Sequence, residues 1–281
     1  MSIVEMAIGK VRGESERDNA GRSGVPIPEV GQEVIPAARQ VAMIVDQKTA
    51  VGAFWFGEAG DAIRNHFRGL RRELLAQLQG IAPKGASSLV LVTSPLPGDG
   101  KTFVSSAIAR TFANAPDFRV TLLDMDLVRR TISSLFNARE MPGVLDCIYG
   151  SSELRDVLTS TDVPRLHFVP AGSVEGDNRE AFVGDGLDTL LARLRALGPH
   201  NLCILDAPPV LPVVETALLA AKVDLVIVVV RAGVTPRAAV LDSIAKLGAD
   251  AKVCVVLNSV VQSHTGEYYD YSNYSSEHQS P

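Results

Sequence analysis

The amino-acid sequence predicts an α/β protein with a doubly wound, mostly parallel sheet that helices cover on both faces. Six short apolar runs after residue 88 carry this prediction, and helical stretches separate them. Almost every position in these runs is apolar, whereas a strand with one wet face would alternate apolar and polar residues. The runs are SLVLVTS (88–94), FRVTLLD (118–124), RLHFVPA (165–171), NLCILDAPP (201–209), LVIVVV (225–230) and KVCVVLNS (252–259).

The rest of the chain divides into four segments. Residues 1–12 place apolar side chains at helical spacing, so we expect a short amphipathic helix that either docks on its own domain or contacts a partner. Residues 13–40 are rich in Gly, Pro and charge, which is typical of a flexible linker. Residues 41–262 should form the main domain, with a second amphipathic helix at 61–80. Residues 263–281 have the composition of a disordered tail.

The overall composition limits the function classes. With 281 residues and a net charge of -5, the chain has no general basic character, which argues against a nucleic-acid partner. Cys147, Cys203 and Cys254 are odd in number and widely spaced, so we expect reduced thiols in the cytoplasm. The N-terminus does not resemble an export signal, and the apolar runs are too short to span a bilayer. We therefore expect a cytoplasmic protein.

A phosphate-binding loop is predicted where the first strand runs through TSPLPGDGKT into an apolar-periodic helix. Backbone N–H groups at a helix start bind phosphate, Lys101 adds a positive charge, and Thr102 offers a hydroxyl to Mg²⁺. The pattern G-x-x-x-x-G-K-[ST] is incomplete, because Pro95 stands at its first glycine. A simple turn before Lys-Thr is the alternative. The residues expected to contact the nucleotide are Pro97, Gly98, Asp99, Gly100, Lys101, Thr102 and Phe103.

Three aspartates stand where strands end. Asp124 and Asp126 close the run LLDMD, and Asp206 closes LCILD. Ligands of a doubly wound sheet bind at the carboxyl ends of its strands, and a carboxylate there can hold Mg²⁺. A single such aspartate more often caps a helix or a turn. Three of them behind a phosphate loop favour a P-loop NTPase fold and phosphoryl transfer, while the absence of H-R-D and D-F-G strings excludes a eukaryotic-type kinase.

These motifs, with the VVLN strand and the tyrosine-rich tail, resemble the bacterial tyrosine kinases of capsule and exopolysaccharide synthesis. The resemblance covers roughly residues 60–281 and is nearest to the exosortase-associated cytoplasmic branch. It implies that ATP and Mg²⁺ are the cofactors and that Lys101 and Thr102 bind them. It also implies that Asp126 and Asp206 hold the metal and that Asp124 activates the tyrosine hydroxyl. Asn258 would lie near the adenine.

The tail supplies the substrate in this resemblance. Four of the five tyrosines of the chain lie in the tail, and the resemblance implies that they are the phosphoacceptors: Tyr268, Tyr269, Tyr271 and Tyr274. It also implies that the subunits form a ring in which each tail enters the active site of a neighbouring subunit. Added phosphates would repel one another and loosen the ring. The resemblance further implies a separate inner-membrane co-polymerase that activates the kinase and recruits it to the membrane, and a tyrosine phosphatase.

Two departures from the family pattern leave alternatives open. Val128 stands where the acidic motif usually has arginine, with Arg129 and Arg130 after it, and the subunit-joining helix motif appears as Asn65, Arg68 and Arg71. A degenerate nucleotide-binding scaffold of an export complex would tolerate both changes. A switch ATPase that positions septa or plasmids shares the sheet, but Leu96 replaces its characteristic loop lysine. A tail used only for protein contact is a further alternative.

Overall fold

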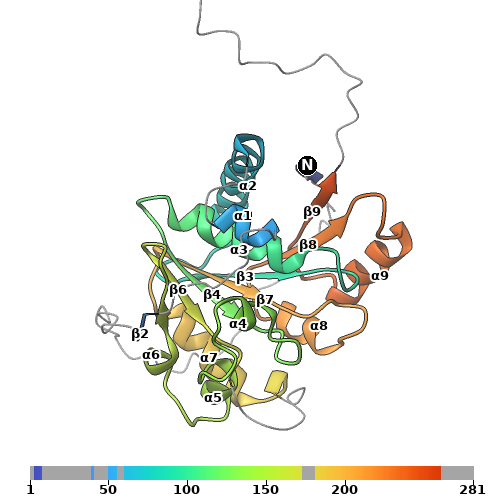
Figure 1. The fold of residues 1–281 in the computed structure, drawn as a ribbon. Helices are drawn as coiled ribbons and strands as arrows, with labels where there is room; N and C mark the ends of the chain where they lie inside the picture. Colours follow the sequence, from blue (N-terminus) through green and yellow to red (C-terminus); the bar gives the residue numbers. More distant parts are fainter. Residues whose placement is uncertain (1–2, 8–38, 41–49, 56–59, 173–180, 261–281) are drawn as a thin grey trace, which may run out of the picture.

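The structure, a computed structural model, describes residues 3–7, 39–40, 50–55, 60–172 and 181–260. Its centre is a nine-stranded sheet in the order β1-β9-β8-β3-β7-β4-β6-β5-β2 (Figure 1). The six strands from β9 to β6 run parallel to one another, whereas β1 is antiparallel to β9 and β5 is antiparallel to β6. The strands are β1 Ile3–Ala7, β2 Arg39–Gln40, β3 Ser88–Thr93, β4 Arg119–Asp124, β5 Thr159–Ser160, β6 Leu166–Val169, β7 Asn201–Asp206, β8 Leu225–Arg231 and β9 Val253–Val260.

Helices cover both faces of the sheet, as the unbroken apolar runs predict. Along β3, Val90 and Val92 pack into one core with α1, α2 and α3, while Leu89 and Leu91 pack into a second core with α5, α7 and α8. Figure 1 shows these two groups of helices above and below the sheet. The helices are α1 Ala50–Trp55, α2 Asp61–Gln79, α3 Lys101–Ala113, α4 Thr131–Leu135, α5 Val144–Ile148, α6 Leu154–Val157, α7 Asp185–Arg195, α8 Glu215–Ala220 and α9 Arg237–Leu247. The predicted α/β fold class and all six predicted strands are confirmed.

The long helix α2 forms where the spacing of apolar residues places it. Its buried residues recur every three or four positions and pack into the first core; they are Phe67, Leu70, Leu74 and Leu78. Its arginines differ in role. Arg68 Nη1 donates to Asn65 Oδ1 at 3.1 Å on the exposed face, whereas Arg71 Nη1 donates to the Thr111 carbonyl at 3.3 Å and so ties α2 to α3. Among the described helices, none is long and apolar enough to cross a membrane.

The helix expected over residues 1–12 is wrong in its described part. Residues Ile3–Ala7 form β1, which pairs with β9 in a register that sets Met6 opposite Val256. An isolated helix of about a dozen residues is marginal in water, while an edge strand offers a full row of unpaired backbone groups. The end of the expected linker also pairs, as β2. The remaining expectations for 8–38 and for the tail at 263–281 lie outside the described residues.

Candidate active site

The loop between β3 and α3 is shaped by two glycines with left-handed backbone angles. Gly98 has φ 90° and Gly100 has φ 95°, values that a side chain strongly disfavours. A Cβ on Gly100 would overlap the side-chain amide of Asn258, whose Nδ2 donates to the Asp99 carbonyl at 3.0 Å. The end of β9 therefore forms a wall of this loop. The first helical bond of α3, from Val104 N to the Gly100 carbonyl at 3.1 Å, leaves the preceding N–H groups at the helix start for an anion.

Asp99 and Phe103 were expected to contact the nucleotide, but their side chains hold the loop in place. Asp99 is buried, with Oδ2 accepting from Leu96 N at 3.0 Å and Oδ1 accepting from Thr235 Oγ1 at 2.7 Å. Phe103 packs edge-on against Phe67, with ring centroids 5.7 Å apart. If these two residues contact a nucleotide, they do so through backbone atoms, because their side chains are engaged inside the protein. Pro97 has no N–H group, so its predicted contact is limited to van der Waals packing.

Lys101, Thr102, Asp126 and Asp206 converge at the carboxyl edge of the sheet. Lys101 Nζ lies 3.1 Å from Asp126 Oδ2 and 3.6 Å from Asp206 Oδ2. Thr102 Oγ1 donates to Asp206 Oδ2 at 2.9 Å. Strands β4 and β7 are neighbours, and their register pairs Asp124 directly with Asp206, which explains why residues far apart in sequence meet. The sequence prediction that these side chains share one site agrees with this geometry.

Burial and mutual charge set the ionisation of the cluster. Desolvation raises the pKa of Asp206, although the positive charge of Lys101 opposes this. Desolvation and the nearby charge of Asp206 raise the pKa of Asp124 to about 7. Desolvation lowers the pKa of Lys101, but Asp206 and Asp126 outweigh it, so the pKa lies above its usual value. Lys101 therefore stays positively charged, and its charge partly neutralises the neighbouring carboxylates Asp126 and Asp206.

Asp124 lies behind this cluster rather than at its surface. Its side chain has no exposed area; Oδ2 accepts from both the N–H and the Oγ–H of Ser133 at 2.8 Å, and Oδ1 accepts from Asp126 N at 3.2 Å. Ser133 Oγ in turn accepts from Ala171 N at 2.9 Å. A tyrosine hydroxyl cannot reach Asp124 in this arrangement, so the role of base expected for Asp124 would require the segment 125–133, which includes the start of α4, to move. Ser133 could not be predicted from the sequence, because a serine nine residues after an aspartate belongs to none of the motifs described above.

The residues present fit a nucleotide with Mg²⁺. Asp206 Oδ1 and Asn258 Oδ1 are buried acceptors without a hydrogen-bond partner in the described part of the chain, and such atoms normally find a donor or a cation. Among the described residues, no three His, Cys, Asp or Glu side chains form a metal cage by themselves. This suits Mg²⁺, which is usually bound by one or two carboxylates together with substrate phosphates and water. Thr102, Asp126 and Asp206 would be its protein ligands.

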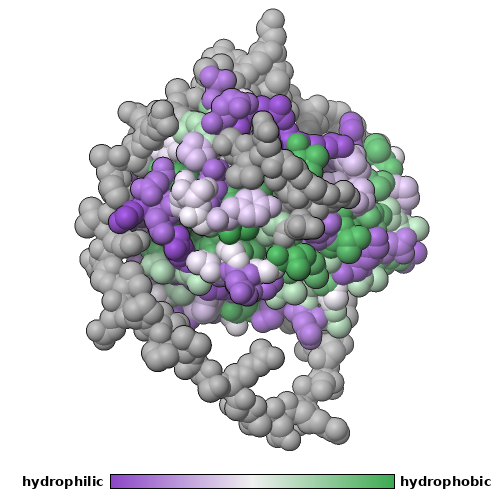
Figure 2. Space-filling model, turned by 90° about the horizontal axis from the view of Figure 1, so that it is seen from below, coloured by the Kyte–Doolittle hydropathy of each residue, from purple (hydrophilic) through white to green (hydrophobic). Residues whose placement is uncertain are grey.

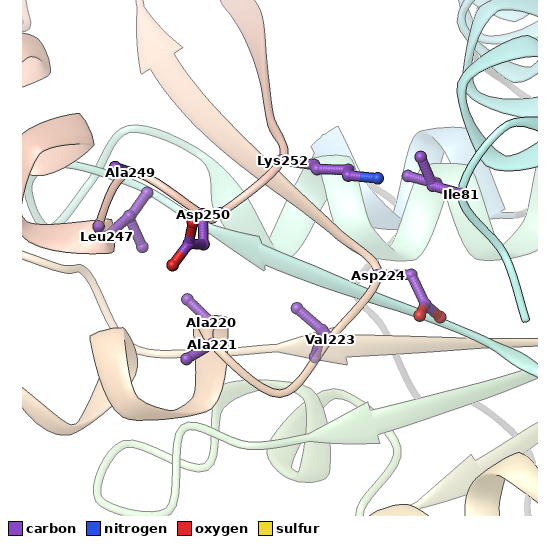
Figure 3. Close-up of a pocket in the computed structure, with 11 residues that line it drawn as sticks. Ile81, Ala220, Ala221, Val223, Asp224, Leu247, Ala249, Asp250 and Lys252 are labelled. Atoms are coloured by element: carbon purple, nitrogen blue, oxygen red, sulfur yellow. The ribbon is translucent and has the colours of Figure 1, made fainter. Parts of the chain in front are cut away.

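A separate cavity of about 380 Å³ lies at the opposite edge of the sheet. It is lined by the ends of α8 and α9 and by residues that precede β8 and β9, among them Asp224 and Lys252 (Figure 3). Asp224 is already engaged, because Arg195 binds both of its carboxylate oxygens at 3.0 Å and Leu89 N donates to it at 2.7 Å. The cavity is thus remote from the phosphate loop, which follows the carboxyl end of β3.

Comparisons with known proteins agree with this site. No protein-family profile matches the sequence. EpsB of Ralstonia solanacearum, which is assigned as a tyrosine-protein kinase, is 33% identical over 160 residues, or 57% of this chain and 21% of EpsB. The chain therefore spans about a fifth of that relative. The tyrosine-protein kinase CpsD of Streptococcus agalactiae is 27% identical over 191 residues, or 67% of this chain and 82% of CpsD.

The fold is shared with a solved kinase domain. That of the Escherichia coli tyrosine kinase ETK matches with a TM-score of 0.65 and 26% identity, over 75% of this chain and 82% of that structure. The nine-stranded sheet, the loop before α3 and the strand-end aspartates are accordingly those of a P-loop NTPase. Sequence and fold lead to the same conclusion: the chain is similar to bacterial tyrosine kinases in both.

Proposed function

We propose that the protein is an ATP- and Mg²⁺-dependent tyrosine autokinase that phosphorylates its C-terminal tyrosines and thereby regulates exopolysaccharide synthesis or export. The convergence of Lys101, Thr102, Asp126 and Asp206 beside the loop before α3 carries this proposal. Within the family we place the chain in the exosortase-associated branch, on the strength of its sequence motifs.

The residues of the site divide the work of phosphoryl transfer. Lys101 and the N–H groups at the start of α3 would bind the phosphates, and Thr102, Asp126 and Asp206 would hold Mg²⁺. The metal, when bound, neutralises charge on the transferred group. Once the segment 125–133 moves away from it, Asp124 would take the proton of the tyrosine hydroxyl, and its raised pKa of about 7 suits a base that works near neutral pH.

The position of β9 supports the tail as substrate. Asn258 contacts the phosphate loop, and β9 ends two residues later at Val260. Tyr268 follows eight residues on, a distance that an extended chain spans in at most about 28 Å. The tyrosines are thus tethered close to a phosphoryl-transfer site. We further propose that the transfer occurs between the subunits of a ring.

The partners belong to the same proposal. An inner-membrane co-polymerase would activate the cytoplasmic kinase and recruit it to the membrane. A tyrosine phosphatase would remove the phosphates from the tail tyrosines. Phosphate on several neighbouring tyrosines adds strong mutual repulsion, which would open the ring.

Mass spectrometry after incubation with Mg²⁺ and ATP tests the proposal, with and without the cytoplasmic segment of the activator. We expect phosphate on Tyr268, Tyr269, Tyr271 or Tyr274 in the wild type and none in Lys101→Ala. Mixing Lys101→Ala as substrate with a kinase whose four tail tyrosines are Phe tests transfer between chains. Nucleotide binding without any tail phosphate would instead favour a scaffold or a switch ATPase.

A further inference from the structure

One arginine beside the phosphate loop has a side chain that the proposed chemistry does not use. Arg231, the last residue of β8, is exposed, and its guanidinium group forms neither a hydrogen bond nor an ion pair with any described residue. Apolar exposure lies elsewhere: Figure 2 shows it on the face below the sheet, where Val214 and Leu218 at α8 are 65% and 45% exposed. What Arg231 offers to a ligand is therefore charge and a planar polar group.

The register of the sheet places the Arg231 side chain beside that of Asn258. The two residues are direct partners on the parallel strands β8 and β9, so their side chains leave the sheet on the same face. That face carries the first core, in which Ile227 and Val229 pack together with α3. Asn258 Nδ2 donates to the Asp99 carbonyl in the phosphate loop at 3.0 Å. Because neighbouring strands lie about 5 Å apart, the Arg231 side chain starts one strand spacing from a side chain that touches the loop.

The backbone of Arg231 is fixed relative to the phosphate loop. Its N–H donates to Thr235 Oγ1 at 3.0 Å, and its carbonyl accepts from Thr235 N at 3.0 Å. Thr235 Oγ1 in turn donates to Asp99 Oδ1 at 2.7 Å. Ala232 N donates to the Asn258 carbonyl at 2.8 Å, which ties the same turn to β9. A free side chain on a backbone held in this way loses less entropy on binding a ligand than one on a mobile loop.

Arg231 lies on the side of the loop toward which a nucleoside would extend. Thr102, Asp126 and Asp206 would hold Mg²⁺ at β7 and β4, and the metal binds the outer phosphates of a nucleotide. Strands β8 and β9 lie on the other side of β3 from β7 and β4, so the base would point toward them. Asn258 Oδ1 supports this direction, because it is a buried acceptor without a donor among the described residues, and a base amino group would satisfy it.

We propose that the guanidinium group of Arg231 stacks on the face of the nucleotide base and so favours purine nucleotides. A guanidinium group is planar, always charged and weakly hydrated, and it stacks on aromatic faces. A purine offers it a larger face than a pyrimidine. The stacking rests on the nucleotide site of the proposed function, but not on transfer to tyrosine. Arg231 is a base-binding residue in this arrangement, and it contacts neither the metal nor the transferred phosphate.

Calorimetry on the full-length protein with Mg²⁺ tests the stacking with two ligands, ADP and inorganic pyrophosphate, which has the phosphates but no base. We expect Arg231→Ala to weaken ADP binding about tenfold and to leave pyrophosphate binding within about twofold of the wild type. Arg231→Lys keeps the positive charge but loses the planar group, so its ADP binding should stay at least about threefold weaker than that of the wild type.

The control, Arg119→Ala, removes the same charge from an exposed strand end at the opposite edge of the sheet and should bind both ligands as the wild type does. CDP gives a further comparison: Arg231→Ala should weaken its binding less than that of ADP, because the smaller pyrimidine gains less from stacking. Thermal melting without a nucleotide checks that each variant is folded.

The outcomes separate the stacking from the kinase function. Unchanged ADP binding in Arg231→Ala would overturn the stacking, and so would equal losses for ADP and pyrophosphate, which would make Arg231 a phosphate ligand. Full recovery in Arg231→Lys would contradict it as well, because a point charge would then suffice. A wild type that binds neither ligand would overturn the nucleotide site and the stacking with it. A wild type with the expected ADP pattern that never phosphorylates its tail would overturn only the kinase function.

Discussion

Replacing Asp124 by Asn removes a fully buried carboxyl group whose pKa the fold raises to about 7 from an ordinary 3.8. The raised pKa means that the folded protein binds this proton more tightly than the unfolded chain does. Folding stability from this group is therefore greatest in acid and falls as pH rises from about 4 through 7, where the buried charge must form. At 1.36 kcal/mol per pKa unit, the loss between pH 5 and pH 8 is about 3 kcal/mol.

Urea unfolding at pH 5, 6, 7 and 8 measures this difference. The single tryptophan, Trp55, is a suitable probe because it is 1% exposed and its Nε1 donates to Asp162 at 3.2 Å. The free energy of unfolding of Asp124→Asn relative to wild type should rise by about 3 kcal/mol across this range. Titrating groups that do not interact with Asp124 are common to both proteins and cancel, and Asp117→Asn, at an exposed position, controls for the loss of one charge. Parallel curves for wild type and Asp124→Asn would refute the reasoning.

Three further predictions concern the loop, the far edge of the sheet and the metal. Gly100→Ala should cost about 2 kcal/mol and abolish ADP binding, because its φ of 95° and the crowded site both oppose a Cβ; Gly85→Ala, with φ 79° in open space, isolates the backbone strain. Arg195→Met should lower the free energy of urea unfolding by about 3 kcal/mol by removing the ion-pair partner of Asp224, with ADP affinity unchanged in a fluorescence titration. Thr102→Val should weaken ADP binding in calorimetry about tenfold with Mg²⁺ and much less with EDTA, and equal losses would contradict the metal role.

The parallel strands and the cluster around Lys101 could be predicted from the sequence because both depend on local patterns. Each apolar run signals its own strand, and the carboxyl ends of parallel strands meet at one edge, so the sequence alone predicts that Asp126 and Asp206 lie near the loop. The contacts that the sequence could not predict are long-range and carry no motif. The hydrogen bond from Thr235 to Asp99 joins residues 136 positions apart, and no sequence pattern around Thr235 predicts this contact.

The shortest elements were also unpredictable. Five residues such as Ile3–Ala7 fit helical and extended spacing almost equally, and their partner strand lies some 250 positions away. The two-residue strands β2 and β5 have no periodicity to detect. In these places the sheet edge decides the local structure, because it satisfies backbone groups that the segment alone would leave to water.

Strand β9 joins three parts of the molecule that the sequence keeps apart. It pairs Val260 with Ile3, its Asn258 bonds to the phosphate loop, and the tyrosine tail continues from its last residue (Figure 1). The two ends of the described chain therefore share one short backbone ladder beside the nucleotide site. Peeling β1 from this ladder would free one side of β9 close to Asn258, so a change at Ile3 would reach the phosphate loop without passing through either hydrophobic core.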